Sequence, residues 1–362
     1  MSHTSITRLC LLLVCVALVF ITSASVTAQT PLYQLHKDGK IWRFTGTPCA
    51  GSNCPGWQMI DNNPATISIV ADGSLLYQLH NTGMIFRFTG TPCNGDHCPG
   101  WLRLDNNAAT KSIVAANGQL YQLHNNGKIF QFTGTPCNGE DCFGWQMLDN
   151  NTDTRAIVAD TVPLVIDPLP AAARLRVGTG TVLYQLHKTG KIFRFTGTPC
   201  SGDACPGWQM LDNNQDTKMI VAGDGQLYQM HKTGKIWRYT NTPCNGDSCP
   251  GWQMIHNDPR NSLIASDGRL FYRLNVAPSW QHAVRTIWRF TGTPCSGSTC
   301  PGWEKLDRNN FSSQIEGNRV QLYQMYVSGH ILRFNGTPCT GNVCPGWQLL
   351  DNNPRTRAIA SH

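Results

Sequence analysis

The sequence predicts an all-β fold, a seven-bladed β-propeller of four-stranded antiparallel blades. Three observations support it: a unit of about 44 residues recurs seven times, no helical periodicity follows residue 28, and the chain starts and ends inside one unit. A fixed period of this length is typical of propellers and solenoids. Seven tyrosines mark the register of the units: Tyr33, Tyr77, Tyr121, Tyr184, Tyr228, Tyr272 and Tyr323.

Residues 1–28 have the features of a secretory signal peptide. A positive charge at Arg8 precedes an apolar stretch from Leu9 to Ile21, and small residues end at Ala28. The apolar stretch is about 13 residues long, whereas a membrane-spanning helix requires about 20. We therefore expect a secreted, extracellular protein whose propeller occupies residues 29–362, without a transmembrane anchor.

Each unit contains four short runs with strand character, separated by turn residues. In the unit that begins at residue 67 they are Ile67 to Ala71, Leu76 to His80, Met84 to Thr89 and Gly100 to Leu104. We name these strands A, B, C and D. Their apolar residues occupy neighbouring positions, so we expect both faces of each sheet to be covered by adjacent blades.

The link between strands B and C is expected to be a tight hairpin. Asp38-Gly39 fits a two-residue type I′ turn, in which glycine supplies a positive φ. With this turn at the tip, Gln34 would face Arg43 across the ladder. The C to D link is longer and rich in proline and glycine, which disfavour ladder pairing.

The two chain ends are expected to complete one blade. Leu32 to Asp61 supplies strands B, C and D, and the missing strand A matches Arg357 to Ala360. A linear solenoid would instead need distinct polar caps. The segment 160–182 is an irregular insertion between strands A and B of one blade, and either a partner-binding loop or a gene-prediction artefact would account for it.

Fourteen cysteines follow the signal segment, and they recur as one C-x4-C couple in each unit. We expect seven local disulfides: Cys49 with Cys54, Cys93 with Cys98, Cys137 with Cys142, Cys200 with Cys205, Cys244 with Cys249, Cys295 with Cys300, and Cys339 with Cys344. A zinc site is the rival interpretation, but it requires four converging ligands, and each couple offers two. We expect no metal and no cofactor.

The charge pattern does not favour nucleic acid as a partner. The net charge is +7, and it falls to +6 without Arg8. Lysine and arginine are scattered through all units, whereas a nucleic-acid-binding domain gathers them on one face. We expect a monomer.

Two polar clusters are expected on the ring face that carries the B to C hairpins, with the A to B and C to D links on the other face. The first is a histidine at the end of strand B: His36, His80, His124, His187 and His231. The second is an Asp-Asn-Asn run at the end of strand D: Asp61, Asn62, Asn63, Asp105, Asn106, Asn107, Asp149, Asn150, Asn151, Asp212, Asn213, Asn214, Asp351, Asn352 and Asn353. These groups are candidates for binding sugar hydroxyls in clefts at the blade junctions. A structural interpretation stays open, because Asp and Asn are common turn residues.

The units resemble the tectonin and tachylectin type of propeller repeat. The similarity lies in Trp57-Gln58-x-Ile60, in Ile69-Val70-Ala71, and in Gly83-x-Ile85-Phe86-Arg87, and it extends over all seven units. Members of this group are lectins of innate defence. The resemblance therefore implies a sugar-binding propeller.

The repetition of polar residues favours binding over catalysis. An enzyme would place single-copy acids, bases or metal ligands in the central funnel, and none stands out. We therefore expect a multivalent lectin with weak sites at the blade junctions and glycans or glycosylated cell surfaces as partners. The alternative is a secreted adhesion or scaffold protein that binds other proteins through a ring face, and an enzyme is third.

Overall fold

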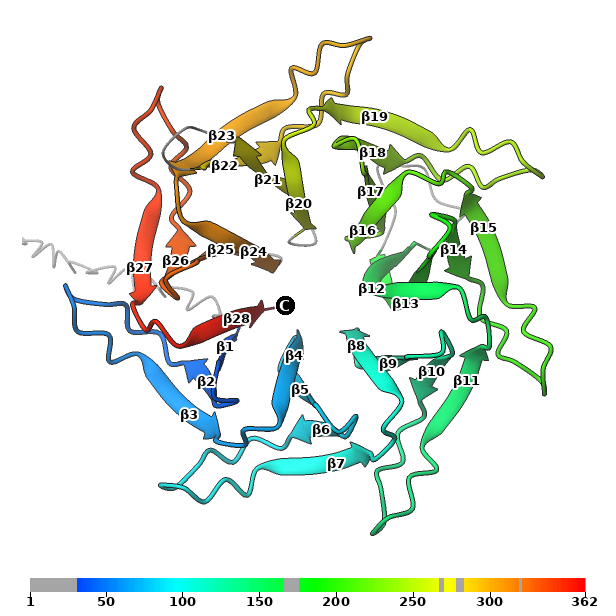
Figure 1. Ribbon diagram of the computed structural model, residues 1–362, viewed down its shortest axis with the longest axis vertical. Helices are drawn as coiled ribbons and strands as arrows, with labels where there is room; N and C mark the ends of the chain where they lie inside the picture. The colour runs from blue at the N-terminus through cyan, green and yellow to red at the C-terminus, as the bar shows by residue number, and fades with distance from the viewer. Residues whose placement is uncertain (1–30, 166–175, 267–269, 278–282, 319–320, 362) are drawn as a thin grey trace, which may run out of the picture.

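The computed structural model describes residues 31–165, 176–266, 270–277, 283–318 and 321–361. The predicted signal peptide, 1–28, lies outside the described residues. All described elements are strands, and they form seven four-stranded antiparallel sheets arranged radially in a ring (Figure 1). The predicted all-β seven-bladed propeller is confirmed.

Each blade runs from an inner strand A to an outer strand D. The A strands are β28 (Thr356–Ser361), β4 (Thr66–Asp72), β8 (Thr110–Ala116), β12 (Thr154–Val165), β16 (Thr217–Gly223), β20 (Asn261–Ser266) and β24 (Ser312–Asn318). The B strands are β1 (Leu32–His36), β5 (Leu75–His80), β9 (Gln119–His124), β13 (Arg176–His187), β17 (Gln226–His231), β21 (Phe271–Ala277) and β25 (Gln321–Tyr326). The C strands are β2 (Ile41–Phe44), β6 (Ile85–Phe88), β10 (Ile129–Phe132), β14 (Ile192–Phe195), β18 (Lys235–Tyr239), β22 (Val284–Phe290) and β26 (Ile331–Phe334). The D strands are β3 (Trp57–Asp61), β7 (Trp101–Asp105), β11 (Trp145–Asp149), β15 (Trp208–Asp212), β19 (Trp252–Asn257), β23 (Trp303–Asn309) and β27 (Trp347–Asp351).

The ring closes as expected, through the last strand of the chain. Strand β28 pairs antiparallel with β1 in the sheet β28-β1-β2-β3, with Tyr33 opposite Ala360 and Gln34 opposite Ile359. The first and last parts of the described chain therefore share one blade. We number the blades from this one, in chain order.

The prediction of a two-residue type I′ turn between strands B and C is wrong, because the loop is one residue longer. The His36 N–H donates to Lys40 O over 2.8 Å, so the loop holds three residues, and only Gly39 has a positive φ, of 83°. This geometry fits a three-residue hairpin loop that ends in a left-handed glycine. A pair of positive-φ residues, as type I′ requires, is found instead in the A to B link at Asn117-Gly118, with φ of 50° and 76°.

The longer loop shifts the cross-strand register. Gln34 lies opposite Trp42, and Arg43 lies opposite Tyr33, so the predicted pairing of Gln34 with Arg43 is wrong. Arg43 instead donates to Gln58 Oε1 in strand D over 2.7 Å. Opposite residues share a face of the sheet, so Gln34 lies on the face of Trp42, and its side chain bonds Asp351 of the neighbouring blade.

The hydrophobic core lies between the blades. At the junction of blades 1 and 2, Leu35 and Ile60 of the first blade pack in one buried cluster with Ile69 and Leu76 of the second. Trp101 covers this cluster, and its Nε1 donates to Ile60 O of the preceding blade over 2.9 Å. The repeated tryptophan is therefore a packing residue that also connects neighbouring blades.

All seven predicted disulfides are present, with Cα to Cα distances of 4.1–4.2 Å. The expectation that the C to D loops stay on the face opposite the Asp-Asn-Asn runs is wrong. Each loop bends back against strand D of the preceding blade; for example, the Cys93 N–H donates to Met59 O over 3.3 Å. The disulfide loop therefore lies beside the end of its neighbour's outer strand.

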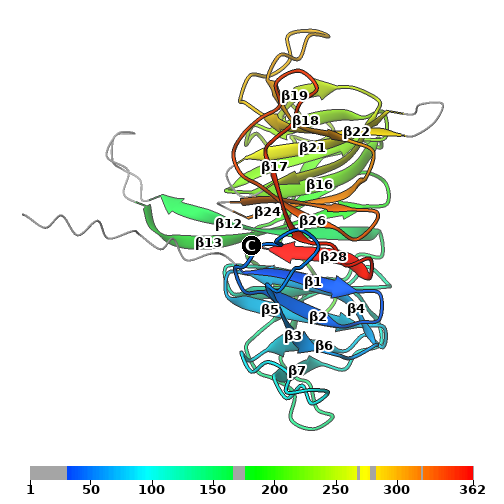
Figure 2. The same ribbon diagram turned by 90° about the vertical axis from the view of Figure 1, so that its left-hand side faces the viewer.

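The 160–182 insertion is more regular than expected. Over the described residues it continues strands β12 and β13 as a paired hairpin, with Asp160 opposite Val182 and Thr161 opposite Thr181. The extension projects away from the ring (Figure 2).

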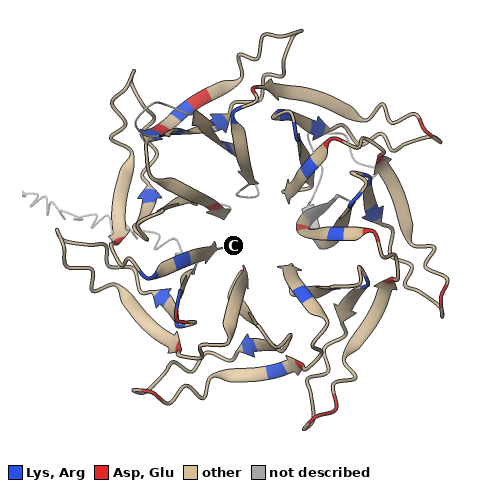
Figure 3. Ribbon diagram, in the orientation of Figure 1, with Lys and Arg blue, Asp and Glu red and all other residues tan. Residues whose placement is uncertain are grey.

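Two findings bear on the expected partners. Lysine and arginine are spread over strands and loops of several blades (Figure 3). In the part of the chain that the structure describes, no helix has the length and apolar character that membrane crossing requires.

Candidate functional site at the blade junctions

A β-bulge at the end of each regular strand D directs an aspartate into the junction. In blade 1, Ile41 lies opposite Asp61 while Trp42 lies opposite Met59, so Ile60 is the extra residue. A bulge breaks the strand alternation. As a result, Ile60 and Asp61 are adjacent in sequence and both buried.

The aspartate belongs to a buried network that joins neighbouring blades. Gln229 Nε2 of blade 5 donates to Asp212 Oδ2 of blade 4 over 2.9 Å, and Thr217 Oγ1 donates to Gln229 Oε1 over 2.6 Å. The bond from Thr or Ser to Gln recurs at 2.6–2.7 Å in six junctions, with these donors: Thr66, Thr110, Thr154, Thr217, Ser312 and Thr356. Burial raises the pKa of each aspartate, and hydrogen bonds from the glutamine and from backbone N–H groups oppose the rise.

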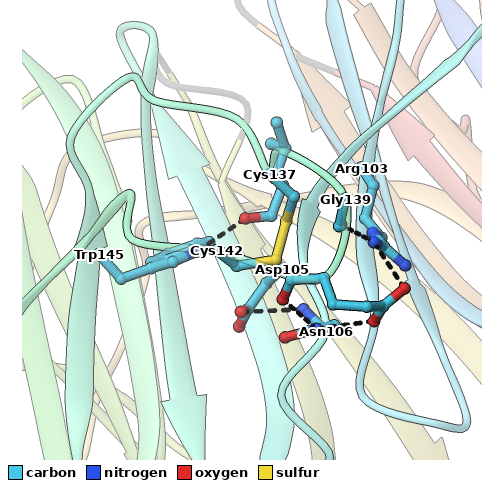
Figure 4. Close-up of a disulfide and its surroundings, with 9 residues drawn as sticks. Arg103, Asp105, Asn106, Cys137, Gly139, Cys142 and Trp145 are labelled. Carbon is cyan, nitrogen blue, oxygen red and sulfur yellow. Dashed lines mark hydrogen bonds and ion pairs between the residues drawn. A yellow bond between two sulfur atoms is a disulfide. The ribbon is translucent and has the colours of Figure 1, made fainter.

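The first asparagine of each run connects strand D to the disulfide loop of the next blade. Asn106 Nδ2 donates to Glu140 O over 2.8 Å, inside the ring closed by Cys137 and Cys142 (Figure 4). Arg103 reinforces this contact through an ion pair of 3.1 Å with Glu140. The same bond to a loop carbonyl is made by Asn62, Asn150, Asn213 and Asn352.

The second asparagine forms an Asx turn with its own backbone. Asn63 Oδ1 accepts from the Ala65 N–H over 2.9 Å, and the turn recurs with Asn107, Asn151, Asn214 and Asn353. Within the described residues, Asn63 Nδ2 and Asn62 Oδ1 make no hydrogen bond. Both side chains are half-buried, and in each amide one polar group is held by the fold while the other makes no hydrogen bond within the described residues.

The histidine at the end of strand B is buried in the same junction. His80 lies opposite Thr66 and two residues after Gln78, on the same face of β5. Its ring packs against Phe86 with centroids 4.6 Å apart, and its buried Nε2 has no hydrogen-bond partner among the described residues. Burial lowers the pKa of His80 and of its four counterparts.

The structure therefore brings the two predicted clusters together, at five contiguous junctions. Each junction pairs one Asp-Asn-Asn run with one histidine of the next blade: Asp351 with His36, Asp61 with His80, Asp105 with His124, Asp149 with His187, and Asp212 with His231. The aspartates and histidines are buried, with 3–5 % exposure, whereas the asparagines reach the surface.

The junction between blades 5 and 6 replaces this network with different chemistry. His256 stands in place of the aspartate, Asn261 in place of the threonine and Arg273 in place of the glutamine. Arg273 Nη1 donates to Asn261 Oδ1 over 2.9 Å, and Asn261 Nδ2 lies 2.9 Å from His256 Nδ1. Burial lowers the pKa of Arg273 to about 9 and that of His256 to about 3.

Neither His256 nor Arg273 was among the candidate residues predicted from the sequence. A feature of the sequence could have identified them: the three residues that replace Asp, Thr and Gln, namely His256, Asn261 and Arg273, all change at the same junction. Another single-copy residue outside that prediction is Glu316, which lines a cavity at the centre of the ring. No group of three or more metal-ligating side chains occurs among the described residues.

Comparisons with known proteins show likenesses of structure only. No family model matches the chain, and no curated protein matches it. Matching solved structures include yeast RCC1 (Prp20) bound to Kap60, with 9% identity over 91% of this chain and 84% of that one, and a TM-score of 0.47. Prp20p of Saccharomyces cerevisiae matches with 10% identity, 92% and 87% coverage and a TM-score of 0.45. Human WBSCR16 matches with 7% identity, 81% and 83% coverage and a TM-score of 0.46. Scores this low carry no argument about function, so function has to be argued from the junctions themselves.

Proposed function

We propose that this protein is an extracellular, multivalent carbohydrate-binding protein with sites at five contiguous blade junctions. The observation that carries the proposal is the repeated pair of half-used amides. At each of these junctions the first asparagine keeps a carbonyl oxygen unused, and the second keeps an amino group unused. An acceptor beside a donor complements a sugar hydroxyl, which both donates and accepts.

The fold fixes the orientation of these groups. The disulfide loop holds the first asparagine, and the Asx turn holds the second. A ligand would therefore bind groups that are already ordered, and little conformational entropy would be lost on binding. The buried aspartate and histidine act in this proposal as supports of the junction.

The number of sites compensates for their small size. A few hydrogen bonds at an exposed junction give weak binding, but simultaneous engagement of several sites by a glycan surface increases avidity about 10²-fold or more. The resemblance to tectonin and tachylectin repeats supports the same class of ligand. Seven disulfides are compatible with an oxidising, extracellular environment. We propose binding without catalysis.

The test removes the Nδ2 donor of the second asparagine at each junction and keeps its Asx turn. In the variant N63D/N107D/N151D/N214D/N353D, each aspartate still accepts the backbone N–H but lacks the Nδ2 donor. The control N53D/N94D/N138D/N245D/N342D makes the same charge change at exposed positions of the disulfide loops. On a glycan array, we expect the junction variant to lose at least 10-fold in apparent affinity and the control to bind like the natural protein. Absence of glycan binding by the natural, oxidised protein would refute the proposal.

Protein adhesion is the second candidate, and the extension of β12 and β13 favours it. This paired hairpin projects beyond the ring (Figure 2) and offers backbone edges to a partner strand. Replacing 161–181 with a two-residue turn restores the A to B link of the other blades, since Asp160 and Val182 match the pair that closes this link in blade 3, Ala116 and Gln119. Capture of a cell-surface protein that is independent of its glycans, and that the shortened chain loses, would support this function.

A further inference from the structure

The centre of the ring carries one carboxyl group in an otherwise apolar set of equivalent positions. In every blade, one residue of strand A lies opposite the register tyrosine of strand B. These residues are Val70, Val114, Val158, Val221, Ala265, Ala360 and, in blade 7, Glu316. Six blades fold with valine or alanine at this position, so the fold does not require a carboxyl group there. The presence of Glu316 therefore suggests a role in function.

Glu316 lines two neighbouring cavities between the inner strands. Their volumes are about 430 Å³ and 320 Å³, and both are bordered by Ser266, Gln314, Glu316 and Gly317. Volumes of this size match those of small-molecule sites. The larger cavity extends along β28 and β4, where Ser68 and Ser361 add hydroxyl groups to its wall.

The wall beside Glu316 is held in place by Gln314. Its Nε2 donates to Ile359 O over 3.0 Å, and its Oε1 accepts from the Ile359 N–H over 3.3 Å. The amide therefore bridges the inner strands of blades 7 and 1 as a backbone pair would. This contact fixes the wall that carries Glu316.

The charges around the cavities favour a neutral ligand. Among the described lining residues, Glu316 and Arg357 are the ionisable groups. Arg357 Nη2 donates to Ile67 O over 2.7 Å, which keeps its positive charge at the larger cavity and disfavours a cation there. Burial raises the pKa of Glu316 to about 8, against hydrogen bonds from Ser361 and Gln314. A carboxylic acid that is mostly protonated at pH 7 both donates and accepts, as a hydroxyl does.

We propose that the centre of the ring binds one small, neutral, polyhydroxylated molecule of monosaccharide size, with Glu316 as its hydrogen-bonding partner. Serine hydroxyls and exposed edges of the inner strands supply further polar contacts, and the aliphatic residues of the wall cover its apolar surface. The proposal extends the proposed function to a single, central site, which is separate from the five junctions.

The experiment measures binding of methyl glycosides of glucose, galactose, mannose and N-acetylglucosamine by isothermal titration calorimetry. We expect one of them to bind with a stoichiometry of one. At pH 9, one unit above the pKa, about one tenth of Glu316 is protonated, so affinity should fall about 10-fold relative to pH 6.5. The variant E316Q should bind at both pH values, because an amide also donates and accepts.

The variant E316V removes the group and introduces the residue that four other blades carry, so we expect it to fold. It should lose the central ligand and keep its binding to a glycan-coated surface. The junction variant N63D/N107D/N151D/N214D/N353D should show the opposite pattern, which separates the two proposals. Binding of no methyl glycoside, unchanged binding by E316V, or affinity that rises with pH would overturn the central site.

Discussion

Replacing Gln229 with leucine tests whether the Asp-Gln-Thr network stabilises the junctions. The side chain is 1 % exposed, accepts from Thr217 and donates to Asp212. In Q229L, a buried hydroxyl and a buried carboxylate each lose one partner. An unsatisfied buried group costs about 1–3 kcal/mol, and breaking the partner of a buried charge costs about 3–5 kcal/mol. Because Thr217 keeps a second acceptor, Asn214 O at 3.2 Å, and Asp212 keeps its bonds from backbone N–H groups, we expect a total loss of about 3–5 kcal/mol at pH 7, most of it from Asp212.

The matched control is Q226L on the same strand. Gln226 is half-buried and donates to Tyr239 O, and leucine occupies the equivalent position in blades 2 and 6, as Leu75 and Leu270. We expect it to cost about 1 kcal/mol, the net value of one ordinary hydrogen bond. The assay is urea denaturation of the oxidised protein, followed by tryptophan fluorescence.

The pH dependence provides a second criterion. The folded pKa of Asp212 lies above its unfolded value, so this group's contribution to stability is present below the unfolded pKa and decreases as pH rises through the folded pKa. Loss of the glutamine raises the folded pKa further, so Q229L should be less destabilising at about pH 3.5 than at pH 7. A cost equal to that of Q226L, or the same at both pH values, would refute the reasoning.

Three further predictions follow from the other junctions, the disulfides and the closing strand. H256D should stabilise the protein by about 1–3 kcal/mol at pH 7, because it gives the buried Arg273 guanidinium the carboxylate that other junctions carry; a lower urea midpoint would contradict this. Removing one disulfide with C93S/C98S should cost about 2 kcal/mol, as the entropy of closing a six-residue loop predicts, and a loss above about 4 kcal/mol would show that the loop also orders its neighbour. Deleting 356–362 should unfold the ring, whereas placing 356–362 before residue 31 through an Asn-Gly turn should restore the urea midpoint. Leu32 already lies opposite Ser361, and in blade 2 the two-residue link closes on the next pair, Asp72 with Leu75. Failure of the rearranged chain to fold would contradict closure by β28.

The sequence alone determined the architecture. Seven units of one period, a C-x4-C couple in each, and a strand-like end that completes the first unit were sufficient to predict the blades, the disulfides and the closure of the ring. These features are readable because they are local or because they follow from counting along the chain.

Only the tertiary structure decided how the polar groups are used. A three-residue loop at Gly39 and a bulge at Ile60 each change the face to which the following side chains point, and neither is visible in the alternation of residues. The partners of Asp61 and Asn62 belong to the next blade, so their burial and bonding depend on how two blades pack. The cavity that Glu316 lines forms only because the seven inner strands meet around one axis. This arrangement places its carboxyl group near the valines and alanines that occupy the same position in the other blades.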